Sequence, residues 1–275
     1  MVLYRENRET DPSSAEKHAA KATEYLRVAP TLAGKKRFMA KQLPFDVFVT
    51  RKISKWETTA KEWNVPLLDA IGADPVEEMI FFWNGHSRMT KEGLEKSLSK
   101  LEWSNSEANK NRDRLGAEEQ AIIDLVRAAA LRALRRHEES EVIITTRVLI
   151  HDKSLFKANL RDDWVLPVAH YEMAANLWME RPTYIKDNGR FISSSEETET
   201  EGTSDNKNGD GDGEEKNSDS DFDKSLEIIK TRECKKHIKE VENWESYELD
   251  ARVGLKVTTA TNAIQKWENS HALVL

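Results

Sequence analysis

The sequence predicts an all-α protein of stacked helical hairpins, a superhelix of degenerate repeats interrupted by a long disordered acidic insertion. Apolar residues recur every three or four positions through most of the chain, which is the period of amphipathic helices. Of the 275 residues, 38% are hydrophobic and 33% are charged, a thin apolar supply for one compact globule. We therefore assign residues 1–192 and 224–270 to one helical-repeat region and residues 193–223 to the insertion.

The first part of the repeat region predicts two helices of different character. A short helix runs from Ala15 to Leu26 and should end at Pro30, because proline has no backbone N–H to donate. A long helix over residues 45–63 follows, and its apolar face is rich in aromatic side chains, which predicts extensive burial. The residues of that face are Phe45, Phe48, Val49, Ile53, Trp56, Ala60 and Trp63.

A helix start follows at Asp74. An aspartate there accepts from free backbone N–H groups, Pro75 is tolerated in the first turn, and Glu77 comes three residues later. This helix carries Val76, Met79, Ile80 and Trp83 and should end at Asn84-Gly85. Residues 91–103 predict another helix, and the polar residues 104–114 predict a loop. The inward positions of the helix over 91–103 are Leu94, Leu98 and Leu101.

The middle of the chain predicts the most deeply packed helix. Residues 117–136 are apolar on two faces, so this helix should be covered on both sides. Residues 138–150 should form its partner, although their β-branched run from Val142 to Ile150 is also compatible with a strand. We predict a helix because the surrounding elements are helical. The next helix begins near Asp163 and continues through Trp178.

This helix resembles the first helix of a tetratricopeptide repeat. Trp164, Pro167, Val168 and Tyr171 fall where such a repeat places Trp, Leu, Gly and Tyr. Ala130 and Ala174 lie about one repeat length apart, somewhat more than the usual ~34 residues. Two of the four residue types agree with this repeat, and the family resemblance described below implies the degenerate tetratricopeptide-like superhelix.

Residues 193–223 differ in kind from the rest of the chain. Ser, Glu, Asp, Gly, Asn and Thr dominate, so burial cannot offset the entropy of ordering this segment, and it should be disordered. Apolar positions resume from Leu226 to Val241 on a helix that needs a partner before the tract. We interpret the tract as an insertion within one fold.

The last predicted helix runs from Trp244 to Ile264 and closes the array. Leu249, Val253, Val257, Ala260 and Ile264 line one of its faces. Tyr247, Ala251, Leu255 and Thr258 form a second stripe, which predicts contacts on two sides. Gly254 costs roughly 1 kcal/mol against alanine in mid-helix, and both a close helix approach and a tolerated defect explain it.

Charge and cysteine content limit the environment and the partners. The net charge is −7 with both signs plentiful, so no global field draws the chain to nucleic acid, and we predict no nucleic-acid partner. One cysteine, Cys234, excludes an internal disulfide and suits a reducing, intracellular compartment. No run approaches the ~20 apolar residues of a transmembrane helix, which leaves peripheral membrane association as the membrane contact.

No pattern predicts catalytic, cofactor-binding or metal-binding residues, so we do not predict an enzyme. Cys234 and His237 share a helix face, but two ligands do not make a metal site. Residues 210–214 begin like a calcium loop, yet Glu215 stands where that turn needs glycine. Basic groups over 35–41 and 132–136 could contact phosphates, and the second is better explained as the solvated face of a helix.

The insertion carries four candidate phosphorylation sites, Ser193, Ser194, Ser218 and Ser220. Each serine has an acidic residue three positions later, the context that acidophilic kinases prefer. Phosphate would add negative charge to a segment that is already acidic. Regulatory phosphorylation and an inert spacer are both compatible with this composition.

Several blocks of the sequence resemble the carboxy-terminal part of the fungal inclusion body clearance family, which is related to the animal tetratricopeptide-repeat protein 39 group. The resemblance covers nearly the whole chain except the acidic insertion. Its blocks include Leu43-Pro44-Phe45, Phe48-Val49-Thr50-Arg51-Lys52, Lys55-Trp56-Glu57, Leu68-Asp69-Ala70-Ile71, Glu78-Met79-Ile80-Phe81-Phe82-Trp83-Asn84-Gly85 and Tyr247-Glu248-Leu249-Asp250-Ala251-Arg252-Val253-Gly254. Family members are longer, so the chain resembles a carboxy-terminal fragment or a short form.

The resemblance implies a non-enzymatic protein of the cytoplasm and nucleus. It implies a role in clearing misfolded-protein inclusions through contacts with lipid-droplet proteins, at inclusions, lipid droplets or the outer face of organelles. It transfers no catalytic or ligand residues.

The predicted function is a scaffold that binds other proteins, because repeat arrays expose long concave surfaces. One alternative is a tetratricopeptide-type co-chaperone or trafficking adaptor, which would need lysines and asparagines aligned to grip a carboxylate terminus. Another is an enzyme with an unfamiliar helical site. The sequence does not tell which of Trp83, Trp103, Trp178 and Trp267 face a groove.

Overall fold

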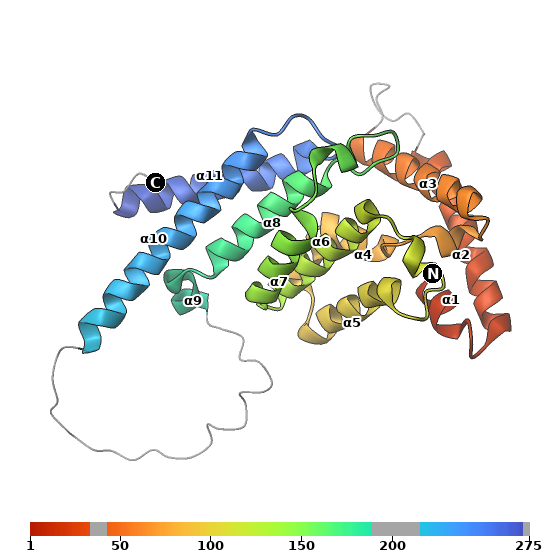
Figure 1. Cartoon of the computed structure of the whole chain (residues 1–275), viewed down its shortest axis with the longest axis horizontal. Helices are drawn as coiled ribbons and strands as arrows, with labels where there is room; N and C mark the ends of the chain where they lie inside the picture. The colour runs from red at the N-terminus through yellow and green to blue at the C-terminus, as the bar shows by residue number, and fades with distance from the viewer. Residues whose placement is uncertain (34–42, 189–214, 272–275) are drawn as a thin grey trace, which may run out of the picture.

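The computed structural model describes residues 1–33, 43–188 and 215–271, with side chains of α10 described from residue 223. Within those residues the regular structure is helical, without strands, and the helices form an elongated array (Figure 1). This confirms the predicted all-α class. The α-helices are α1 (Val2–Asn7), α2 (Pro12–Ala33), α3 (Pro44–Trp63), α4 (Pro75–Phe82), α5 (Lys91–Glu102), α6 (Ala117–Ala133), α7 (His137–Ile143), α8 (Val165–Met179), α9 (Pro182–Asn188), α10 (Glu215–Glu242) and α11 (Asp250–His271).

The helices pack mainly against their neighbours along the array. α2 packs on α3 at one end, α6 lies centrally among α5, α7 and α8, and α10 packs along α8 and α11 at the other end (Figure 1). α6 is covered on both sides, as predicted, with Ile122, Leu125 and Ala130 fully buried. The partner of α6 is helical rather than extended, because α7 continues into a π-helical turn, Ile144–Val148.

Local signals set several helix ends. The Asp74 carboxylate accepts from the Val76 N–H at 2.9 Å, which confirms the predicted start of α4. Thr90 caps α5 by accepting from the Gly93 N–H at 3.2 Å. α3 ends at Asn64, whose φ of 54° lies in the left-handed region that favours Asn and Gly.

An aromatic cluster joins α3 and α4 to the start of α8. Trp164 is fully buried, and its ring centroid lies 4.8 Å from that of Phe82. Phe48 of α3 packs against Phe82 at 5.0 Å. Edge-on aromatic pairs of this kind are worth about 1 kcal/mol beyond their buried area. The cluster therefore fixes where α8 begins relative to α3.

Beside this cluster, three cations of α3 converge on one buried carboxylate. Asp162 lies in the segment before α8, and its side chain is fully buried. Its carboxylate forms ion pairs with Arg51 Nη2 at 2.8 Å, Lys55 Nζ at 2.5 Å and Lys52 Nζ at 3.3 Å. Burial alone would raise the pKa of Asp162, but Lys52, Lys55 and Arg51 hold it well below its usual value.

Carboxylates of other helices complete this cluster. Glu78 of α4 pairs with Lys52 at 2.7 Å. Glu118 at the start of α6 accepts from the backbone N–H of Asp162 at 2.6 Å and pairs with Lys55 at 3.2 Å. Glu248, which precedes α11, takes a bidentate contact from Arg51. We call these residues the Asp162 cluster, and they join α3, α4, α6, α8 and α11.

Several predicted boundaries are corrected. Pro30 does not end its helix: α2 continues to Ala33, because one proline near a helix end removes a single backbone hydrogen bond. α11 begins at Asp250 instead of Trp244, since Leu249 has a φ of 65° and breaks the helical run. α10 begins at Glu215, so residues 215–223 of the predicted insertion lie in its first turns. Residues 193–214 lie outside the described part of the chain.

On α4, Val76 is 53% exposed, as is Trp83 just after the helix, whereas Glu77 and Glu78 are buried with cationic partners. One of the two predicted faces of α11 is corrected. On α11, the first face is confirmed by the burial of Val253, Val257 and Ile264. The second stripe of α11 does not pack inward, since Ala251, Leu255 and Thr258 are exposed. Open space surrounds Gly254, so close helix approach does not explain this residue.

Replacing Asp162 with asparagine should destabilise the protein by about 3 kcal/mol, because the neutral amide removes an anionic partner from the buried Lys52 and from the partly buried Arg51 and Lys55. Urea denaturation at pH 7 measures this difference. The difference should shrink below about pH 4, where the unfolded chain protonates Asp162 and the benefit of its low pKa is lost. The control is Asp113→Asn, whose side chain is 91% exposed. Equal stability of both variants at pH 7 would contradict the proposed role of the cluster.

Candidate binding groove

An open cavity of about 470 Å³ lies between α8 and α11, with α10 as its floor. We call it the apolar groove. Cys234 and Ile238 of α10, both buried, form the floor. The walls come from α8 and α11, with contributions from the end of α6 and from α9. Its lining residues are Arg132, Tyr171, Ala174, Ala175, Trp178, Met179, Tyr184, Cys234, Ile238, Leu255, Lys256, Thr259, Ala260 and Ala263.

The walls combine small side chains with large apolar ones. Ala174 and Ala175 on α8 face Ala260 and Ala263 on α11, which leaves room between the two backbones. Leu255 stands on the rim and is 73% exposed, the most exposed large hydrophobic side chain among the described residues. An apolar concave surface with an exposed leucine on its rim is typical of a protein-binding site.

Two cations line the groove, and no carboxylate is among the described residues that line it. Arg132 Nε pairs with the buried Glu172 at 2.8 Å, just behind the wall. Lys256 lies over the Tyr171 ring at 5.4 Å, and burial lowers its pKa. Lys256 forms no ion pair with the described residues. The groove is therefore apolar with an excess of positive charge.

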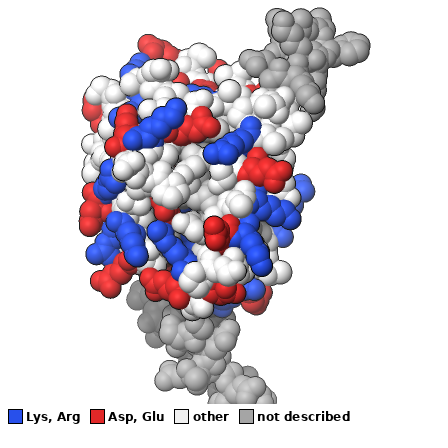
Figure 2. Space-filling view, turned by 90° about the vertical axis from the view of Figure 1, so that its right-hand side faces the viewer, with Lys and Arg blue, Asp and Glu red and all other residues white. Residues whose placement is uncertain are grey.

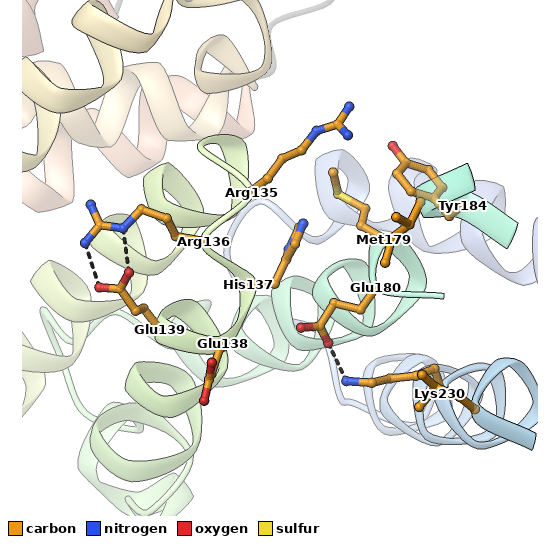
Figure 3. A pocket seen from close by; sticks show the side chains of 11 residues that line it. Arg135, Arg136, His137, Glu138, Glu139, Met179, Glu180, Tyr184 and Lys230 are labelled. Carbon is orange, nitrogen blue, oxygen red and sulfur yellow. Dashed lines mark hydrogen bonds and ion pairs between the residues drawn. The ribbon is translucent and has the colours of Figure 1, made fainter. Parts of the chain in front are cut away.

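A second cavity of about 450 Å³ adjoins the groove, and Met179 and Tyr184 line both (Figure 3). This second cavity is polar. Arg136 pairs with Glu139 at 2.6 Å, and Lys230 of α10 pairs with Glu180 at the end of α8 (Figure 3). Four of its six charged side chains pair with one another in this way, and Arg135 donates to the carbonyl oxygen of Asn188 at 2.8 Å, so few charged groups are left for a ligand.

Two carboxylates, those of Glu141 and Glu180, form a pair beside the polar cavity. Burial, together with the hydrogen bond and charge of Glu180, raises the pKa of Glu141 to about 7, while Lys230 opposes the shift. The folded protein therefore holds a proton on Glu141 that the unfolded chain releases near pH 4.5. The contribution of Glu141 to the free energy of unfolding therefore falls as the pH rises from about 4.5 through 7.

The structure places the predicted site residues as follows. Cys234 lies in the groove floor, where burial raises the pKa of its thiol to about 12. His237 contacts His170 at 2.9 Å between ring nitrogens. Among the described residues, no cluster of three or more His, Cys, Asp or Glu could hold a metal ion. The serines Ser193 and Ser194, the calcium-like residues 210–214 and the basic group over 35–41 lie outside the described residues. Ser218 and Ser220 lie in the first turns of α10.

The tryptophans and the second basic group are now placed. Trp178 lines the groove and Trp267 is buried, whereas Arg5 stacks on Trp103 and Arg252 on the exposed Trp83. Arg132 is not a solvated phosphate-binding side chain, because it pairs with Glu172. At the end of the molecule near α1–α3, Figure 2 shows cations and carboxylates interspersed over the face.

The apolar groove itself was missed by the sequence analysis. Its signal was present in the second stripe of α11, which we interpreted as a packing face. The observation that separates the two interpretations is long-range: Tyr171 and Trp178 of α8 line the other side of the groove, and Leu255 stays 73% exposed among the described residues. In the described part of the chain, no helix has both the length and the apolar content to cross a bilayer.

Stacked helices with a solvent-open apolar groove define a class: a helical-repeat protein of the type that binds other proteins. Residues 2–134 match the model of the family described as Iml2/Tetratricopeptide repeat protein 39. An "Inclusion body clearance protein iml2" of Aspergillus niger is 58% identical over 99% of this chain, and one of Aspergillus terreus is 56% identical over 99%. One of Pyricularia oryzae is 35% identical over 92%. The chain belongs to this family, which confirms the resemblance.

The match covers part of each relative. The chain spans 36% of the length of the Aspergillus niger and Aspergillus terreus proteins and 28% of that of the Pyricularia oryzae protein. No solved structure matches the chain. The apolar groove, formed mainly by α8 to α11, lies beyond the residues matched by the family model.

Replacing Glu141 with glutamine should raise the melting temperature by about 2 °C at pH 8, because it removes a buried negative charge beside Glu180. At pH 5, where Glu141 is protonated in the folded protein, the melting temperature should not change. Differential scanning calorimetry at both pH values measures the effect. Glu57→Gln, on the exposed side of α3, is the control. A lower melting temperature of Glu141→Gln at pH 8 would argue against the carboxylate pair.

Proposed function

We propose that the chain is a non-enzymatic protein-interaction scaffold whose apolar groove binds other proteins. The observation that carries this proposal is the groove itself, an apolar cavity of about 470 Å³ that the described residues leave open between two helices of a repeat array. The polar cavity beside it holds charged groups that pair with one another instead of converging on a reactive position. Docking without chemistry therefore accounts best for this end of the molecule.

We also propose that the scaffold acts in the clearance of misfolded-protein inclusions through contacts with lipid-droplet proteins. Its support is the name of the relatives, which are called inclusion body clearance proteins, and the length of the match. The proposed locations are the cytoplasm and nucleus, with recruitment to inclusions, lipid droplets or the outer face of organelles. Membrane association would be peripheral.

The alternative of a carboxylate-terminus clamp is less well supported. Such a clamp needs asparagine and lysine side chains directed into the groove. Asn176 on α8 instead donates to Ser140 at 2.8 Å, and its carbonyl lies 2.9 Å from His137. This amide is fully buried among α7 and α8, away from the lining of the groove.

In cells, Leu255→Glu in the native protein should at least double the half-time of inclusion clearance after heat stress, because it places a charge on the rim of the groove. Ile229→Glu is the matched control, since Ile229 on α10 is 52% exposed and does not line the groove. Time-lapse microscopy of a tagged aggregating reporter gives the half-time. Proximity labelling with the tagged native protein gives its neighbours under the same stress.

Two results would refute parts of this proposal. An equal half-time of inclusion clearance in Leu255→Glu and in the control would show that the groove does not take part in clearance. If proximity labelling finds no inclusion or lipid-droplet proteins, the role inferred from the relatives does not extend to this chain.

For the acidic tract, we propose that Ser193, Ser194, Ser218 and Ser220 are phosphorylated to regulate the scaffold. The support is their acidic context, in which each serine has an acidic residue three positions later. Phosphopeptide mass spectrometry of the native protein should find at least one of the four modified under stress. Four unmodified serines would leave the tract an inert spacer.

A further inference from the structure

We infer that the apolar groove takes a short helical segment of another protein that is apolar on one face and carries a carboxylate beside Lys256. This inference rests on the proposed function as a protein-interaction scaffold. It adds the chemistry of the partner, which follows from the shape of the groove, its apolar lining and its charge.

The apolar part of the partner is set by the floor and the rim. Cys234 and Ile238 close the bottom, and Tyr171 and Trp178 form one side. Leu255 on the opposite rim is 73% exposed and would be covered by an occupant. Covering this side chain and the alanines of both walls removes apolar surface from water, which favours an apolar occupant.

The helical form of the partner follows from the walls. Leu255, Thr259 and Ala263 recur every four residues along α11, so the wall is about 12 Å long at 1.5 Å per residue. That length corresponds to about two turns of an occupying helix. Because two alanines of α8 and two of α11 line the walls, the groove leaves room for another helix, as in helix-in-groove recognition. Two apolar side chains one turn apart would then point to the floor.

The carboxylate on the partner is inferred from the positive charge of the groove. The groove is lined by Arg132 and Lys256 without a carboxylate among the described lining residues. The charge of Arg132 is matched by Glu172 at 2.8 Å. Nearby, Arg252 stacks on Trp83 and donates to the carbonyl oxygen of Phe82 at 2.8 Å. Lys256 alone in this group has neither an ion pair nor a hydrogen bond within the described residues.

Lys256 is partly withdrawn from water, the negative charge of Glu172 attracts its ammonium group, and Arg132 and Arg252 repel it. A carboxylate on the partner would give this ammonium group an ion pair where water is already scarce. A cation on the partner would meet the two positive side chains that line the groove, Arg132 and Lys256. The groove therefore discriminates by charge as well as by apolar shape.

The test uses the whole chain and a phage-displayed library of 12-residue helical peptides. Selected peptides should carry apolar residues at i and i+4 together with Asp or Glu. The strongest is synthesised with its acidic residue and with the matching amide, and fluorescence anisotropy gives both dissociation constants. Lys256→Gln should weaken the acidic peptide about fivefold and change the amide peptide less than twofold. Leu255→Ser should weaken both.

Matched variants keep the result interpretable. Lys266→Gln removes an exposed lysine from the same helix, and Ile229→Ser removes an exposed apolar side chain from α10; neither residue lines the groove, so neither should change binding. Leu255 is so exposed that its substitution should leave thermal stability within about 0.5 kcal/mol, which denaturation checks.

Four results would overturn the inference. These are a selection that yields no peptide, peptides enriched in Lys or Arg, peptides unaffected by Leu255→Ser, and equal losses of the acidic and amide peptides on Lys256→Gln. Displacement of the acidic peptide by phosphatidylserine-containing vesicles would also overturn it in favour of a lipid surface. If any of these results occurs while Leu255→Glu still slows inclusion clearance, the proposed function stands and only the partner chemistry fails.

Discussion

The architecture depends on the ion pairs that three cations of α3 make with the buried Asp162. Arg51, Lys52 and Lys55 project from one helix toward a carboxylate held in the segment before α8, and Glu118 fixes that segment by accepting from its backbone N–H. A buried charge of this kind is costly unless every group has a partner, so the arrangement specifies one relative position of α3, α6 and α8.

The same cluster positions both walls of the apolar groove. Asp162 and the buried Trp164 hold the start of α8, which is one wall. The other wall is α11, and Arg51 donates to the carboxylate of Glu248 just before this helix. The backbone N–H of Glu248 also donates to the carboxylate of Asp163 at 3.0 Å. α10 then fills the space behind α8 and α11 and becomes the floor. The surface proposed to bind partners is thus positioned by charged residues just before the N-terminal ends of α8 and α11.

Sequence periodicity predicted most helices because burial of an apolar stripe is a local pattern, as in α3 and α6. Periodicity does not show where a charged side chain is buried by a distant partner: Glu78 and Glu118 lie in the core, each paired with a lysine of α3. It also failed at Leu255, since an apolar stripe on α11 indicates a contact without telling whether this chain or another protein supplies it. The groove needed the long-range arrangement of three helices.

The proposed docking of partner proteins in the apolar groove can be mapped along the backbone. Hydrogen–deuterium exchange of the chain with and without the selected acidic peptide tests it most directly, because exchange reports every backbone segment at once. The account predicts slower exchange confined to α11 and to the end of α8, where the walls lie. Slower exchange confined to α2 and α3, at the other end of the array, would contradict it.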